Sequence, residues 1–175
     1  MYLLEMQYCV DFALASRKLM MSRVEEAFID ACGDVGFGEI INIAHNYAVM
    51  EHHFGKNVLV HRKGATRAYK DELGIIPGSQ GTASYIVKGK GNAESFMSCS
   101  HGAGRKMGRK QATRELDLEA EKKQLDDLGV IHSVRNQKDL DEAPGAYKDI
   151  ALVMENQKDL VDIVVELKPL AVVKG

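Results

Sequence analysis

Short apolar, β-prone runs, each closed by a loop that contains glycine, fill the middle of this 175-residue chain and limit the folds open to it. Four such runs follow one another, at residues 58–61, 73–76, 82–87 and 94–98. Branched and aromatic side chains favour strands and glycine favours turns, so the pattern predicts a sheet of short strands. Because ligands often bind at loops that end neighbouring strands, we expect a binding site where these loops meet.

Helical patterns flank this middle region on both sides. Residues 2–32 carry apolar side chains at three-to-four-residue spacing, with Gly33 as a C-cap, and predict one helix or two helices that meet near Met21. Further helical patterns cover 40–54, 105–128 and 147–167, and an extended segment is expected at 170–173. We predict an α+β fold, one domain over residues 1–175, in which helices flank a central mixed β-sheet.

Composition excludes several classes of protein. A hydrophobic fraction of 45% with 27% charged residues is typical of a globular domain, which argues against disorder. No apolar run is long enough to cross a bilayer and no basic leader opens the sequence, so we expect a cytoplasmic protein without membrane contacts. The cysteines, Cys9, Cys32 and Cys99, lack paired spacing and predict reduced, partly buried thiols.

The formal net charge of −2 conceals an uneven distribution along the chain. Residues 56–114 hold twelve Lys or Arg against three acidic residues, a net charge of +9, so the remainder carries −11. This division predicts a localised positive face suited to a polyanion. The alternative is that the charges are spread over unrelated surfaces.

The segment from His101 to Arg105, His-Gly-Ala-Gly-Arg, has properties that a phosphate site needs. Glycines let the backbone approach an anion, and a helix predicted to begin near Arg105 would direct its free N–H groups there. Lys106, Arg109 and Lys110 would add positive charge. A neutral imidazole beside a bound phosphate is a competent nucleophile toward phosphorus. The alternative is a glycine turn with an incidental histidine.

Histidines also gather in the segment 40–54. If this segment is helical, His45 and His52 lie seven residues apart on one face and could bind one metal ion. The spacing does not identify the metal. The alternative is that His52 and His53 are solvated near a helix end.

Taken together, seven motifs resemble the RtcB family of RNA ligases, in order and at similar spacing across nearly the whole chain. They are His45-Asn46-Tyr47, Arg62-Lys63-Gly64-Ala65-Thr66-Arg67-Ala68, Ile76-Pro77-Gly78-Ser79, Ser84-Tyr85, Ser100-His101-Gly102-Ala103-Gly104-Arg105, Pro144-Gly145-Ala146-Tyr147-Lys148 and Val173-Lys174-Gly175. Each motif alone is weak, but the series is specific.

The resemblance implies a GTP- and Mn²⁺-dependent ligase that joins an RNA 3′-phosphate or 2′,3′-cyclic phosphate end to a 5′-hydroxyl end through a histidine–GMP intermediate. By position, it implies that His101 is guanylylated and that His45 binds manganese. The nucleotide contacts that it implies are Asn46, Pro77, Gly78, Ser79, Gln80, Ser84, His101, Gly102, Ala103, Gly104 and Lys174. From charge and position we add Arg62, Lys63, Arg67 and Arg105 as contacts to RNA or phosphate.

The sequence also departs from the family pattern. The chain corresponds to the C-terminal portion of the family, whose upstream half supplies an Asp, a Cys and two more His as metal ligands without counterpart here. We therefore expect an N-terminal half, a partner polypeptide or an activating protein to complete the site. Gln80 stands where the family commonly has Met, and Gly108 where Ser is usual.

Two other functions stay open: a non-catalytic guanine-nucleotide or RNA-binding module, and an unrelated metal hydrolase built on His45, His52 and His53.

Overall fold

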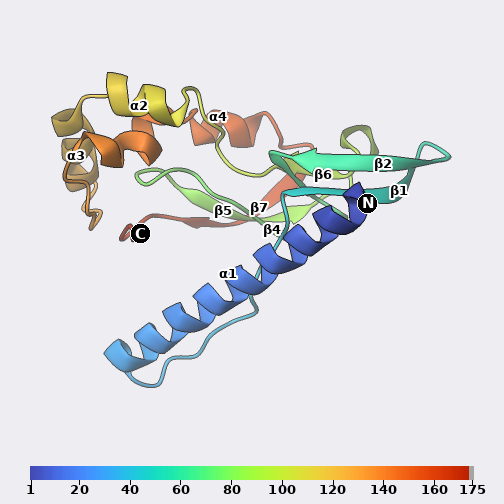
Figure 1. Cartoon of the computed structure of the whole chain (residues 1–175), viewed down its shortest axis with the longest axis horizontal. Helices are drawn as coiled ribbons and strands as arrows, with labels where there is room; N and C mark the ends of the chain where they lie inside the picture. Colours follow the sequence, from blue (N-terminus) through green and yellow to red (C-terminus); the bar gives the residue numbers. More distant parts are fainter. Residues whose placement is uncertain (174–175) are drawn as a thin grey trace.

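The computed structural model describes residues 1–173 and has the predicted α+β class (Figure 1). The helices are α1 (Tyr2–Cys32), α2 (Arg109–Glu115), α3 (Leu118–Asp127) and α4 (Ile150–Glu155), with 3₁₀ turns η1 (Ala93–Ser95), η2 (Gln137–Glu142) and η3 (Pro144–Ala146). The strands are β1 (Asn46–His53), β2 (Lys56–Lys63), β3 (Ala65–Arg67), β4 (Leu73–Ile76), β5 (Ser84–Gly89), β6 (Ser98–Ser100) and β7 (Val161–Leu167). Within the described part of the chain, no helix has the length and apolar character needed to cross a membrane.

The strands form three small antiparallel sheets, and the prediction of one central mixed sheet is wrong in this respect. Strands β1 and β2 form a hairpin, β3 pairs with β6, and a three-stranded sheet has the order β4-β5-β7. Gly64, with φ of 76°, turns the chain between β2 and β3 and so separates the hairpin from the next sheet. Parallel pairing in the described residues is limited to a single bridge between Ile131 and Ala171.

Two predicted helices contain strands. Residues 46–53, inside the expected helix 40–54, form β1, which pairs with β2 along its whole length. The expected helical region 147–167 contains only the short helix α4, and its second half is β7. The region 105–128 is helical only from Arg109 and breaks at Leu116, because Asp117 caps a new helix by accepting from Ala120 N at 2.7 Å. The expected strand 94–98 begins instead as η1, and β6 follows it.

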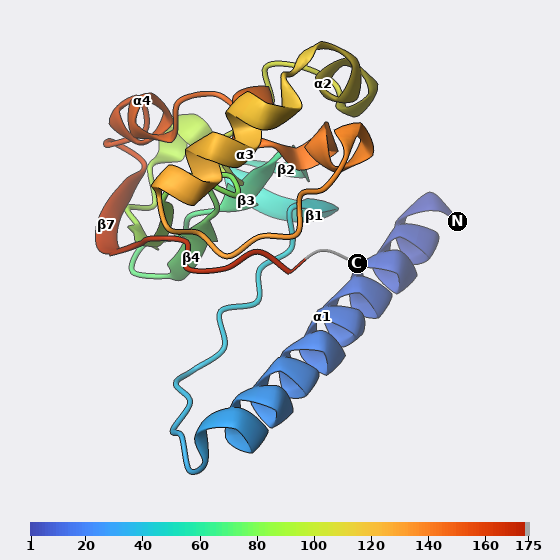
Figure 2. The same cartoon turned by 90° about the vertical axis from the view of Figure 1, so that its left-hand side faces the viewer.

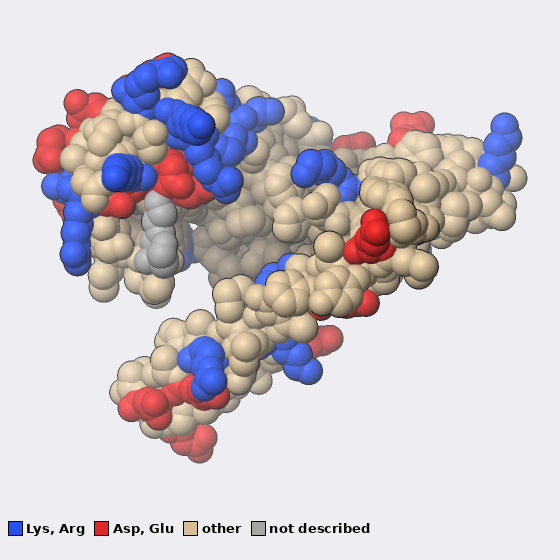
Figure 3. Space-filling view, in the orientation of Figure 1, with Lys and Arg blue, Asp and Glu red and all other residues tan. Residues whose placement is uncertain are grey.

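Helix α1 is one continuous helix of 31 residues that ends at Gly33 and contains no buried residue. It stands apart from the body in Figure 2 and is joined to it by the segment 33–45. Its few polar contacts include Ala48 N–H to Met6 Sδ (3.1 Å) and Arg17 Nε to Asn42 Oδ1 (2.8 Å). Large apolar side chains along it are exposed, and Figure 3 shows long uncharged stretches on its surface.

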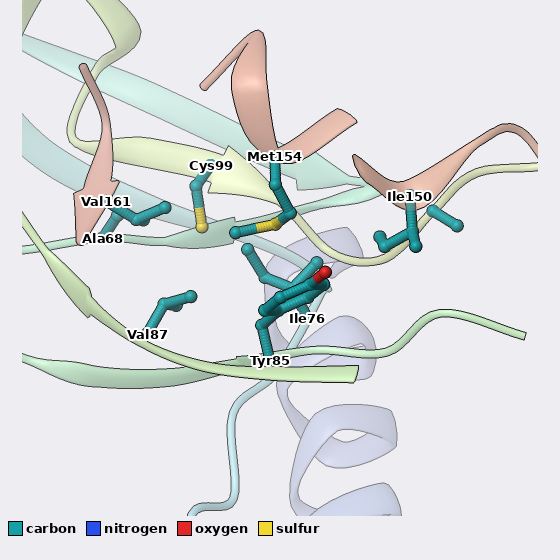
Figure 4. Close-up of a cluster of buried hydrophobic side chains, with 9 residues drawn as sticks. Ala68, Ile76, Tyr85, Val87, Cys99, Ile150, Met154 and Val161 are labelled. Atoms are coloured by element: carbon teal, nitrogen blue, oxygen red, sulfur yellow. The ribbon is translucent and has the colours of Figure 1, made fainter. Parts of the chain in front are cut away.

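Two apolar clusters hold the body together. In the first, Met154 and Ile150 of α4 meet Ile76, Tyr85 and Val87 of β4 and β5, with Cys99 between them (Figure 4). The second lies under α3; its buried members are Leu125, Val130, Val134, Leu140 and Ala143. The first cluster includes Cys99 and Ala103, which flank His101, so the loop that carries this histidine rests on the core. All three cysteines are free thiols as predicted, but only Cys99 is buried.

A buried charge pair fixes the β1–β2 hairpin against the strand that leads to His101. The guanidinium of Arg62 is 1% exposed and donates to both carboxylate oxygens of Glu51, at 2.5 and 2.9 Å. It also donates to Ser98 Oγ (3.0 Å), at the start of β6, and to the carbonyl of Phe96 (2.9 Å), just before β6. Burial alone would raise the pKa of Glu51, but hydrogen bonds from Arg62, His53 and Tyr69 outweigh it and lower this pKa from 4.5 to about 2.

The loop between β4 and β5 is held by its own polar side chains. Gly78 N donates to Ser84 Oγ at 3.2 Å, and Ser79 N donates to Thr82 Oγ1 at 2.7 Å. A methyl group on Gly78 would lie 2.1 Å from the carbonyl oxygen of Ala83, so only glycine fits this turn. The loop therefore has one closed conformation.

We expect Glu51→Gln to destabilise the fold by roughly 3–5 kcal/mol at pH 7, because Arg62 would remain buried without a counter-charge. Urea unfolding measures the free energy of unfolding. Since the pKa of Glu51 is lowered in the folded state, its contribution is present above about pH 4.5 and is lost toward pH 2. Plotted against pH, the free energies of unfolding of the unaltered protein and of Glu51→Gln should therefore converge between pH 4.5 and pH 2. Glu119→Gln, in an exposed pair with Lys122, is the control; parallel curves for Glu51→Gln would contradict the expectation.

We expect Gly78→Ala to lower stability by about 1–3 kcal/mol, because its methyl group would collide with backbone that has to move. Thermal unfolding provides the measurement. Gly36→Ala is the matched control, since a methyl group there meets no atom within 4 Å. Equal melting temperatures for the two variants would show that the loop is not closed as described.

Candidate active site

His101 lies immediately after β6, and its ring is oriented by one backbone carbonyl. Its Nδ1 is 2.8 Å from the carbonyl oxygen of Gly64, the residue that follows β2. Because a carbonyl oxygen can only accept, Nδ1 carries the proton of the neutral ring. The lone pair of the imidazole is then on Nε2. The side chain is therefore set in the tautomer that a nitrogen nucleophile requires.

The ring of His45 stacks on the ring of His101. Their centroids are 5.3 Å apart and their planes are inclined by 21°. His45 comes from the segment just before β1, so contact between the two histidines depends on the hairpin being docked on β6. Burial lowers the pKa of His45, and the positive charges of His101, Arg17 and Lys63 lower it further. A neutral imidazole is the form that binds a metal ion.

The other two histidines of this segment do not join His45. His52 is exposed on a strand and bonds to Asn57, whereas His53 is buried and bonds to Glu51. The prediction that His45 and His52 share a helix face is wrong because β1 is a strand. The alternative, that His52 and His53 are both solvated, is wrong for His53, which is buried. Among residues 1–173, no group of three or more His, Cys, Asp or Glu side chains could hold a metal ion.

The glycine loop after His101 is less open to an anion than predicted. Gly102 N lies 3.4 Å from Ser100 Oγ, and Ala103 N donates to the carbonyl of Pro77 at 2.9 Å. Helix α2 begins at Arg109, so the prediction of a helix N-terminus at Arg105 is wrong. Residues 105–107 instead bond to the segment 146–147, through an antiparallel bridge and the Ala146 carbonyl.

The proline loop, Pro77–Gly81, lies against the glycine loop, Gly102–Gly104. The Pro77 carbonyl contacts Ala103 N, and a methyl group on Gly102 would lie 3.1 Å from that same carbonyl. Gln80 is partly buried, and its amide oxygen has no hydrogen-bond partner among the described residues. The predicted nucleotide contacts in this group are Pro77, Gly78, Ser79, Gln80, Ser84, Gly102, Ala103 and Gly104. Lys174 lies outside the described residues.

Most of the predicted RNA-binding cations are neutralised within the chain. Arg62 is buried, so its prediction as an RNA contact is wrong. Arg105 donates to Glu142 Oε2 (2.9 Å) and to the Asp141 carbonyl, and Arg67 pairs with Glu72. Lys63 remains exposed and forms no ion pair with a described residue. Two of the compensating carboxylates, Glu51 and Glu142, come from outside the basic segment 56–114.

Each of the two stacked histidines lines a cavity, His45 the first and His101 the second. The first, about 660 Å³, lies between α1 and the hairpin and is lined by Arg17, His45, Asn46, His61 and Lys63 among others. The second, about 390 Å³, opens on the α4 side and is lined by Gly64, Ser100, His101, Ala103, Gly104, Lys148, Val153, Asn156, Gln157 and Leu160.

Sequence reasoning missed two residues of the smaller cavity. Gln157 is buried, and its Oε1 accepts from Ser100 N at 2.9 Å, which supports the strand before His101. Nothing in the sequence pattern singles out Gln157. Lys148 was named only as the last residue of the Pro144–Lys148 motif, and no role was predicted for it.

Known proteins similar in sequence to this chain are named ligases. A family model described as "tRNA-splicing ligase RtcB" matches residues 1–175. The RNA-splicing ligase RtcB of Escherichia coli K12 is 47% identical over 140 residues, which cover 78% of this chain and 33% of the relative. The tRNA-splicing ligase RtcB of Pyrococcus horikoshii is 36% identical over 99% of this chain and 23% of the relative.

A third relative extends the comparison to another bacterium. The RNA-splicing ligase RtcB of Mycobacterium bovis is 35% identical over 99% of this chain and 45% of the relative. The chain thus spans less than half the length of these relatives. Because the family model covers every residue and the motifs occur in order, the chain belongs to the RtcB family of RNA-splicing ligases.

Proposed function

We propose that this chain carries the nucleophile of a GTP- and Mn²⁺-dependent RNA ligase that joins a 3′-phosphate or 2′,3′-cyclic phosphate end to a 5′-hydroxyl end. The observation that carries the proposal is the hydrogen bond from His101 Nδ1 to the Gly64 carbonyl, which leaves Nε2 free. The ligase names of the relatives support the reaction class. The proline loop beside the glycine loop supports a nucleotide substrate.

The first step forms a bond between His101 Nε2 and the α-phosphorus of GTP and breaks the bond from that phosphorus to the bridging oxygen. Pyrophosphate leaves with the electron pair. The Nδ1 proton stays on the ring, held by the Gly64 carbonyl, so the ring of the adduct is positively charged. A cationic imidazolium is a good leaving group, and this state prepares the ring for the second step.

In the second step an oxygen of the RNA 3′-phosphate attacks the adduct phosphorus, and Nε2 recovers its electron pair as a neutral imidazole. The 5′-hydroxyl oxygen then attacks the activated 3′-phosphorus, GMP leaves, and the hydroxyl proton passes to solvent. A cyclic phosphate has to take up water first to give the 3′-phosphate. The role of this chain in each step is to hold His101 in one tautomer and orientation.

The described residues do not fit a complete manganese site. His45 offers one neutral imidazole, and residues 1–173 hold no group of three or more possible ligands. Mn²⁺ sites commonly use several oxygen or imidazole ligands. We therefore propose that a second polypeptide, or sequence corresponding to the rest of the longer relatives, supplies the others. RNA would meet the exposed Lys63 by charge.

The incomplete manganese site favours one alternative, a guanine-nucleotide or RNA-binding module without catalysis. Such a module would keep the two loops and the exposed cations but would form no adduct. A hydrolase built on His45, His52 and His53 has no structural support, because His53 is buried against Glu51.

We expect a covalent GMP adduct on His101 when the chain is incubated with GTP, Mn²⁺ and the N-terminal portion of the Escherichia coli relative as a separate polypeptide. Intact-protein and peptide mass spectrometry would detect it. His101→Ala should abolish the adduct, whereas His52→Ala, at an exposed position on β1, should retain it.

The absence of an adduct, combined with RNA binding that weakens as salt rises, would favour the binding module instead. A variant at Lys63 tests whether this salt dependence comes from the exposed cation. Lys63→Gln should reduce the slope of log affinity against log salt by about one.

A further inference from the structure

We propose that Lys148 binds a phosphoryl anion in the smaller cavity beside His101. The proposal rests on the proposed function for the identity of the anion but not for the existence of the site. The structural evidence has three parts: the neutralisation of four nearby arginines, the position of Lys148 on the glycine loop, and the lining of the cavity.

Four arginines near the site are already bound to carboxylates. Arg62 pairs with Glu51, Arg67 with Glu72, and both Arg105 and Arg109 with Glu142. A guanidinium that is paired in this way has little charge left for a phosphate. Among the residues that line the two cavities, Arg17, Lys63 and Lys148 make no ion pair with any described residue. Arg17 and Lys63 line the larger cavity, whereas Lys148 lines the smaller one.

The backbone of Lys148 is bound to the glycine loop. Its N–H donates to the carbonyl of Gly104 at 2.9 Å, and the neighbouring residues Ala146 and Ile150 are buried. The side chain lies over the loop as well, because a methyl group on Gly104 would be 3.9 Å from Lys148 Cδ. The stem thus lies beside Gly104, and Lys148 is exposed and lines the smaller cavity.

The lining of the smaller cavity suits an anion. Of the described residues that line it, Lys148 alone is a Lys or Arg, and none is an Asp or Glu. Asn156 and Gln157 add amide groups. A positive charge in a cavity that is lined by His101 and by no Asp or Glu fits a phosphate monoester or phosphoanhydride. Lysine binds such groups as a point charge.

Two sources could supply this anion: the pyrophosphate portion of the nucleotide, or the 3′-phosphate of an RNA end. Binding measurements on the full chain separate them without depending on adduct formation. The probes are inorganic pyrophosphate, and a short oligoribonucleotide with either a 3′-phosphate or a 3′-hydroxyl. Isothermal titration calorimetry at low salt measures each affinity.

We expect Lys148→Gln to weaken binding of one phosphate probe by about tenfold or more, because a charge-assisted contact is lost. Lys106→Gln is the matched control: it makes the same charge change two residues beyond Gly104, and Lys106 lines neither cavity. Lys148→Arg should restore part of the affinity. Loss confined to pyrophosphate indicates the nucleotide source, and loss confined to the 3′-phosphate oligonucleotide indicates the RNA source.

Equal affinities for Lys148→Gln and Lys106→Gln would overturn the proposal, and so would a lack of binding of either phosphate probe by the unaltered chain. Thermal unfolding of both variants confirms that they are folded. These outcomes are separate from the adduct experiment. An unaltered chain that binds pyrophosphate but forms no adduct would retain the Lys148 site while rejecting the ligase.

Discussion

The buried pair between Arg62 and Glu51 is the interaction on which the arrangement of the site depends. It joins β1 to β2 and, through Ser98 and the Phe96 carbonyl, joins the hairpin to β6. Two residues beyond Arg62, the Gly64 carbonyl accepts from His101. The histidine is therefore positioned from both sides, by the strand that precedes it and by the hairpin that faces it. Since burying two charges costs desolvation energy, such a pair contributes more to a unique geometry than to stability.

The parts of the fold that sequence reasoning predicted are those with a local cause. Helix 2–32 and the strand runs 58–61 and 73–76 have periodicities or turn residues that decide their structure within a few positions. Residues 46–53 and 161–167 were mistaken for helices, because a short apolar run does not distinguish a strand from a buried helix. Strand β7 pairs with β5, more than seventy residues earlier in the chain, and no local signal announces that partner.

The candidate site divides in the same way. The resemblance placed His45, His101 and the loop Pro77–Gly81 in one site. In the structure the rings of His45 and His101 stack, and the Pro77 carbonyl accepts from Ala103 N, two residues after His101. The charge count did not foresee that Arg62 and Arg105 are paired, because the carboxylates that neutralise them lie outside the basic segment and reach it only through the tertiary fold. Lys148 became a candidate for the opposite reason. The bridge between Arg105 and Tyr147 brings the neighbouring residue to the glycine loop from forty residues away.

The hairpin pairs residue by residue from Asn46 with Lys63 at its base to His53 with Lys56 at its tip. Because side chains alternate along a strand, one extra residue within β2 would turn Arg62 to the opposite face and shift the carbonyl that holds His101. One extra residue at the Phe54-Gly55 turn would change neither, because the paired strands beyond it would keep their register. Insertions are thus tolerable at the tip of the hairpin but not along its paired strands. The number of residues in those strands determines where the Gly64 carbonyl meets His101.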